Sequence, residues 1–121
     1  MAKKPKATPT KELQALCVVW QKRLRLQDWK ITVNFFEFEE NYTYGGCTTT
    51  PNFQEANIGV SSKLAADRVQ IEQTLVHELI HVTFAQLRPD LCKELDPHTA
   101  VGHCFEVGVD MLSRALVEAY K

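Results

Sequence analysis

A long apolar segment contains an H-E-x-x-H pattern. Its two histidines are His77 and His81, and Glu78 directly follows the first. In a helix, side chains at i and i+4 share one face about one turn apart, so both imidazoles can bind one metal ion. Glu78 then points toward the open side, where it can act as general base on a metal-activated water. The pattern predicts one Zn²⁺ per chain and hydrolytic chemistry.

The segment that carries this pattern is expected to be a buried helix over residues 69–87. It contains neither glycine nor proline, it ends before Pro89, and its apolar residues cover most of the circumference. Three titratable side chains in such a helix are costly to bury without a task. The competing interpretation is a pair of partly exposed helix histidines beside an unrelated glutamate.

A catalytic zinc site needs a third protein ligand and one open position. Three downstream residues are candidates for that ligand: Glu106, His103 and His98. Glu106 lies in a second predicted helix, residues 99–120, and would complete a His-His-Glu set. A solvated histidine near the start of that helix is the ordinary explanation for His98 and for His103.

Asp110 is the expected partner of a metal-binding histidine. Glu106 and Asp110 are spaced i and i+4, so both can face the central helix. Asp110 could accept the second imidazole N–H of His77 or His81 and so hold the ring in one tautomer. Both carboxylates lie beside the stripe that we expect to form the core face of this helix: Val101, Phe105, Val109, Leu112, Leu116 and Tyr120.

The pattern His77-Glu78-x-x-His81 followed by Glu106-x-x-x-Asp110 resembles the gluzincin metallopeptidases, whose third ligand is that glutamate. The size and element order are similar to minimal zincins, which are frequent in phages and mobile elements and include relatives of the repressor-cleaving ImmA/IrrE peptidases. The resemblance covers roughly residues 29–116. It implies a zinc-dependent metallopeptidase acting on a protein or peptide, although the 24 residues between His81 and Glu106 exceed the spacing in thermolysin-type enzymes.

Zincins also place an edge strand beside the metal to bind the substrate backbone. The resemblance assigns this role to Ile58, Gly59 and Val60.

Two alternatives compete with the gluzincin interpretation. SprT-like proteases share H-E-x-x-H but take their third ligand from a histidine in a segment reading roughly H-G-x-x-F. Residues 102–105 match this only in part, and the match would make His103 the ligand and the protein a DNA-associated protease. The other alternative is a zinc-binding regulatory or interaction module with little or no proteolysis, because so small a domain has little material for the walls of a cleft.

The remaining periodicities predict an α+β fold, with helices packed on a short three-stranded sheet. Residues 1–9 are expected to be a flexible basic arm and residues 10–121 a single zincin-like domain. Alternation and turn residues place the other elements as a helix over 11–26, strands over 29–38, 47–50 and 56–61, and a turn over 41–46 that includes Gly45 and Gly46. Residues 89–97 are expected to form a loop.

Composition and charge indicate which class of partner and which cell compartment to expect. The chain has 121 residues, 45% of them hydrophobic, and a net charge of −1. Four of its 14 basic residues fall in the first eleven positions, which leaves the rest with 10 basic and 15 acidic side chains. An acidic body makes nucleic acid an unlikely partner. The sequence shows neither a membrane-spanning run nor an export signal, so we expect a cytoplasmic protein with its four cysteines as free thiols.

Overall fold

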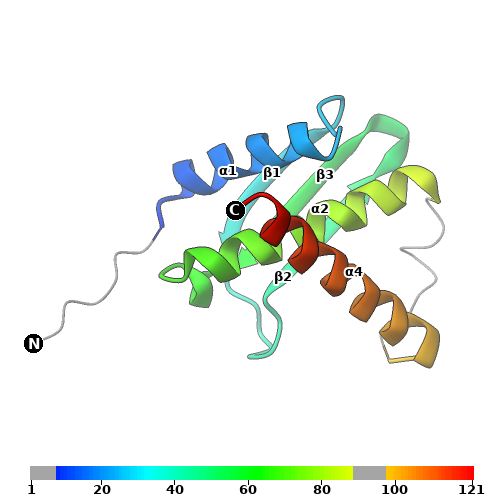
Figure 1. The fold of residues 1–121 in the computed structure, drawn as a ribbon. Helices are drawn as coiled ribbons and strands as arrows, with labels where there is room; N and C mark the ends of the chain where they lie inside the picture. The colour runs from blue at the N-terminus through cyan, green and yellow to red at the C-terminus, as the bar shows by residue number, and fades with distance from the viewer. Residues whose placement is uncertain (1–7, 89–97) are drawn as a thin grey trace, which may run out of the picture.

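Residues 8–88 and 98–121 are described by the computed structural model of the chain (Figure 1). They contain three α-helices and one three-stranded mixed sheet, which confirms the predicted α+β class. The helices are α1 (Thr10–Arg23), α2 (Arg68–Leu87) and α4 (Ala100–Ala119); the strands are β1 (Lys30–Phe36), β2 (Gly45–Thr50) and β3 (Glu55–Ser61). The predicted 89–97 loop and most of the predicted N-terminal arm lie outside the described residues.

Side-chain caps and one backbone turn set the helix ends. Asp67 caps α2 by accepting a hydrogen bond from the backbone N–H of Gln70, and Thr99 caps α4 in the same way through Gly102. The first helix is shorter than predicted. It ends at Arg23 because Arg25 adopts a left-handed backbone conformation, with φ of 61°, which turns the chain toward β1.

The sheet has the strand order β1-β3-β2, with β3 parallel to β1 and antiparallel to β2. Ile58 in β3 pairs with Val33 on one side and with Cys47 on the other. The expectation that Ile58, Gly59 and Val60 form an edge strand is therefore wrong, because both edges of β3 are already paired and cannot accept a further strand. The predicted turn at Gly45 and Gly46 is also wrong, since these residues begin β2.

The helices lie in layers on one face of the sheet. In Figure 1, α1 and α2 lie in front of the strands and α4 crosses in front of α2. The core lies between the sheet and the first two helices and includes Leu13, Trp20, Val33, Val60 and Leu75. Trp20 is fully buried, and its indole N–H donates to the Glu72 carboxylate over 2.9 Å, so α1 is tied to α2.

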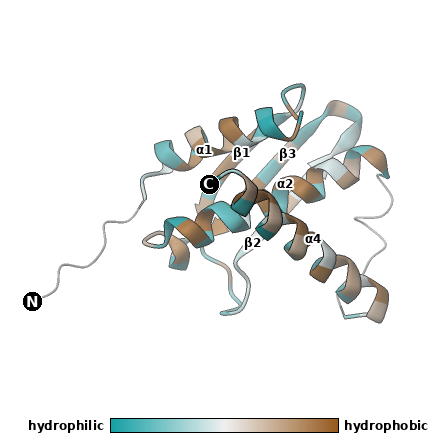
Figure 2. Cartoon of the chain, in the orientation of Figure 1, coloured by the Kyte–Doolittle hydropathy of each residue, from teal (hydrophilic) through white to brown (hydrophobic). Residues whose placement is uncertain are grey.

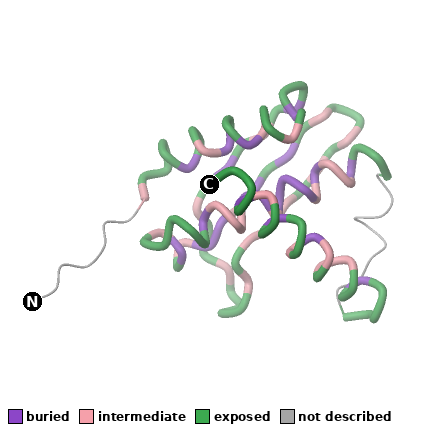
Figure 3. Tube along the Cα trace, in the orientation of Figure 1, coloured by how far each residue is buried: buried purple, intermediate pink, exposed green. Residues whose placement is uncertain are grey.

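The helix α2 is the most buried of the three, as predicted. Figure 3 shows buried positions along its length, and Figure 2 shows that most of them are hydrophobic. Glu78 is the exception: a carboxylate only 6% exposed in the middle of this helix. Within the described ranges, no helix combines the length and apolar character that a membrane crossing requires.

The core face of α4 differs from the predicted stripe. Val101, Leu112 and Tyr120 are at least half exposed, whereas the buried positions are Gly102, Val109, Ser113 and Val117. Phe105 and Leu116 pack against the core, as expected. Apolar side chains nearly surround α4, so their spacing alone cannot select the face that packs. In the structure, the small residues Gly102 and Ser113 lie on the contact face.

Matched leucine truncations should distinguish the two faces. Leu75→Ala, at a fully buried position, should lower the free energy of unfolding by about 2–5 kcal/mol through lost burial and a cavity. Leu112→Ala, at a half-exposed position, should change it by only about 0.5 kcal/mol. Urea titration monitored by circular dichroism measures both. Equal decreases in the free energy of unfolding for the two variants would show that Leu112 is part of the core.

Candidate metal centre

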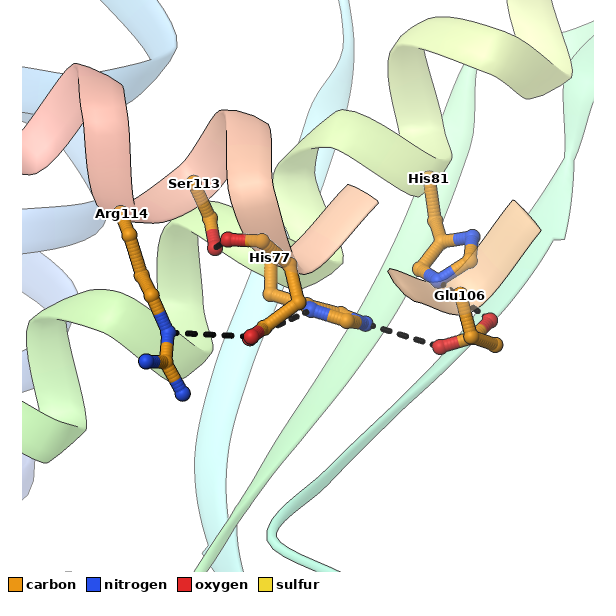
Figure 4. A network of polar contacts seen from close by, with 6 residues as sticks. His77, His81, Glu106, Ser113 and Arg114 are labelled. Carbon is orange, nitrogen blue, oxygen red and sulfur yellow. Dashed lines mark hydrogen bonds and ion pairs between the residues drawn. The ribbon is translucent and has the colours of Figure 1, made fainter. Parts of the chain in front are cut away.

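The two histidines of α2 share one face and meet a carboxylate from α4. The imidazole rings of His77 and His81 lie 5.1 Å apart between centroids. The Glu106 carboxylate bridges them: its Oε2 lies 3.0 Å from His77 Nε2, and its Oε1 lies 2.9 Å from His81 Nε2 (Figure 4). Two nitrogens and a carboxylate from two different helices therefore converge on one small volume.

The imidazole and carboxylate groups at this point could hold a metal ion. Zinc ligands lie about 2.0–2.2 Å from the ion, so neighbouring donor atoms in a tetrahedral site are about 3.3–3.5 Å apart. The two nitrogen–oxygen separations are only slightly shorter. The side chains of His77, Glu78 and His81 also offer ligand atoms within 4.8 Å of one another. This group of three could therefore hold a metal ion, and Glu106 contacts its two histidines.

Burial and the neighbouring histidines act on Glu78 in opposite directions. Desolvation raises the pKa of this carboxyl, and the positive charges of His81 and His77 only partly counter it. A carboxylate that binds a proton more readily than usual is suited to accept one from water near neutral pH. Glu78 therefore has the burial that suits a general base, and its side chain lies close to Gly45 of β2.

Glu106 and His77 each change the pKa of the other. Burial lowers the pKa of His77, but its hydrogen bond to Glu106 and the charges of Glu78, Glu106 and Asp110 together outweigh burial and raise it. The hydrogen bonds from His77 and His81 move the pKa of Glu106 well below its ordinary range. The ionised carboxylate is the form that binds a metal, so Glu106 is held ready to act as a ligand.

Asp110 lies near the other nitrogen of His77. Its Oδ1 is 3.7 Å from His77 Nδ1, an ion-pair separation rather than a hydrogen bond. Arg114, one turn further along α4, holds the same carboxylate, with its Nε donating to Asp110 Oδ2 over 3.0 Å. Asp110 is thus placed to orient the His77 ring when Nε2 faces a metal.

The alternative third ligands occupy other positions. His103 is exposed on α4, three residues before Glu106, and His98 is exposed just before the helix begins. Of the three candidates, Glu106 is the one that contacts both imidazoles of α2. The assignment of Glu106 as third ligand stays a prediction, now with a direct contact behind it.

A cleft of about 580 Å³ opens beside these side chains, between α2, α4 and the segment that leads into β2. Tyr42 and Tyr44 line it, so the structure brings both tyrosines near the histidine pair. The lining residues that the sequence analysis did not connect with the site include Gly45, Thr74 and Arg114. Helical spacing could have found two of them, since Thr74 precedes Glu78 by four residues and Arg114 follows Asp110 by four.

Comparison with known proteins found no counterpart. No protein-family model matches the chain, and neither a curated protein nor a solved structure shows significant similarity to it. The assignment of function therefore depends on the site and its residues.

Proposed function

We propose that this protein is a zinc-dependent metallopeptidase that hydrolyses peptide bonds, with His77, His81 and Glu106 as metal ligands and Glu78 as general base. One observation carries the proposal. The Glu106 carboxylate meets both imidazoles, while the buried Glu78 carboxylate lies in the same open cleft. A structural zinc site has four protein ligands and needs no cleft, whereas a hydrolytic site needs a base, a ligand-free position and room for substrate.

Zinc bound there would supply a Lewis acid and lower the pKa of a coordinated water toward about 7. The protein residues do the rest. Glu78 accepts the proton of the attacking water and delivers it to the leaving amine. Its burial excludes bulk water from the carboxylate, and its raised pKa matches it to that exchange. Asp110, held by Arg114, keeps the His77 ring in the orientation that directs Nε2 into the site.

The substrate backbone is proposed to bind along β2 rather than β3. The strand β2 pairs with β3 on one side, and its other edge is not paired within the described part of the sheet. Its first residue, Gly45, lines the cleft beside Glu78. An extended peptide added to this edge would pass the histidine pair, which is the geometry that backbone recognition by strand addition requires.

Relationship to the gluzincins, including the small peptidases related to ImmA/IrrE, is part of this proposal. The chain order of ligands and the contact between Glu106 and both histidines support it. The SprT-like alternative needs a metal-binding His103, which lies at an exposed position. The acidic body also favours a protein or peptide substrate in the cytoplasm over a DNA-associated role.

Cleavage of a general substrate tests the proposal. Zinc-loaded protein should cleave quenched fluorescent casein, a chelator such as 1,10-phenanthroline should abolish cleavage, and added Zn²⁺ should restore it. Fluorescence increase and gel analysis of the fragments measure the activity. Cleavage that persists in excess chelator would show a different mechanism or a contaminating protease, and would contradict a zinc-dependent reaction.

A further inference from the structure

The sheet comes close to α2 at Gly45, the first residue of β2. A Cβ added there would lie 2.6 Å from Thr74 Cγ2 and 3.3 Å from both Cγ and Oε1 of Glu78. A separation of 2.6 Å is well inside van der Waals contact, so a side chain fits there only if the Thr74 side chain, α2 or β2 moves. The carboxylate of the proposed base is therefore packed against a strand residue that has no side chain.

Backbone conformation does not explain this glycine. None of the described glycines has a positive φ, so the backbone of Gly45 is one that any residue can adopt. What Gly45 supplies is space. Thr74 and Glu78 are four residues apart on the same face of α2, and both point at this glycine. Gly108 on α4 is the contrasting case, because a Cβ there would meet nothing within 4 Å.

We propose that Gly45 is a positioning residue for Glu78: its missing side chain lets β2 approach α2 closely enough to hold the carboxylate at the histidine pair. This inference rests on the proposed function. A general base must lie about 2.6–3.2 Å from the heavy atom that carries the proton it removes, and a misplacement near 1 Å can cost about 100-fold in rate. A methyl group at Gly45 would push on Glu78 directly and on Thr74 more strongly.

The sequence offers a matched control and a matched rescue. Gly46→Ala makes the same change one residue later, on the opposite face of the sheet, where the new Cβ would meet the ring of Phe38 at 3.3 Å. Thr74→Ser removes Cγ2, the atom of the closest contact, and keeps the hydroxyl. The set is therefore Gly45→Ala, Gly46→Ala, Thr74→Ser and the double variant Gly45→Ala/Thr74→Ser.

The first readout is the casein assay on zinc-loaded full-length protein. Gly45→Ala should keep about one zinc per chain and a KM within about twofold, while kcat falls at least about tenfold. Gly46→Ala and Thr74→Ser should each lower kcat less than Gly45→Ala does, and the double variant should recover most of the loss. An unchanged kcat in Gly45→Ala, or a loss that Thr74→Ser fails to relieve, would overturn the proposal.

The second readout is independent of proteolysis. Co²⁺ is loaded in place of zinc, and its visible absorption reports on the environment of the ion. Gly45→Ala should shift the spectrum toward that of Glu78→Gln, whereas Gly46→Ala should match the wild type. If the wild type binds metal but cleaves nothing, the peptidase proposal fails, and these spectra still decide the role of Gly45. If the spectrum of Gly45→Ala equals that of the wild type, Gly45 has only a packing role. The same conclusion follows if neither Gly45→Ala nor the double variant folds.

Discussion

Glu78→Gln should lower the kcat of casein cleavage by about 100- to 10,000-fold while the protein still binds one zinc per chain. The reason is that an amide keeps the size of the side chain but cannot accept the proton of the attacking water. The metal ligands are unchanged, and the substitution removes a charge that is costly to bury, so folding should not suffer. Steady-state kinetics and metal analysis by mass spectrometry measure the two effects on one preparation.

Glu118→Gln is the matched control for this experiment. It makes the same carboxylate-to-amide change on α4, at an exposed residue whose charge pairs with Lys121. Its kcat should equal that of the wild type, since surface ion pairs contribute little. If Glu78→Gln instead remained as active as Glu118→Gln with its zinc bound, Glu78 would not be the base. If neither the wild type nor any variant cleaved peptide while all held zinc, the protein would be a zinc-binding interaction module.

Glu106→Ala should abolish stoichiometric zinc binding, whereas His103→Ala should leave it intact. Glu106 is the carboxylate that contacts both imidazoles, and its removal leaves two protein donors where a catalytic zinc needs three. The loss of affinity should exceed the roughly 10- to 100-fold that follows removal of an outer partner of a ligand. Metal content after dialysis, together with titration against a chromophoric chelator, measures it.

Asp110→Asn provides the intermediate case in the same titration. Asp110 contacts His77 but is not one of the proposed ligands, so its change to an amide should weaken zinc binding by about 10- to 100-fold without abolishing it. The pattern across the three variants identifies the ligand set. Zinc lost in His103→Ala and retained in Glu106→Ala would instead support the SprT-like arrangement.

Short-range patterns were enough to predict that His77, Glu78 and His81 lie close together. His77, Glu78 and His81 are separated by fixed steps within one helix, so their relative directions follow from helical geometry. The same reasoning placed Glu106 and Asp110 on one side of a later helix. That part of the prediction needed only the conclusion that both segments are helical, which the absence of glycine and proline over residues 69–87 and the apolar spacing over residues 99–120 supported.

Strand pairing could not be predicted in this way. The alternation around Ile58 shows a strand with one buried face, but a central strand and an edge strand can share that pattern. Pairing depends on hydrogen bonds between residues far apart in the sequence. In the structure, β3 lies between β1 and β2, and this order moved the proposed substrate edge from Ile58–Val60 to the strand that begins at Gly45.

The rotation of α4 and the surroundings of Glu78 likewise depend on long-range packing. Hydrophobic residues on several sides of α4 allow more than one contact face, and in the structure Val109 and Val117 lie on the face that joins the core. Gly45 looks like an ordinary turn glycine in the sequence. Its proximity to Thr74 and Glu78 arises because β2 packs against α2, and the required closeness of two backbones is a property of the folded chain.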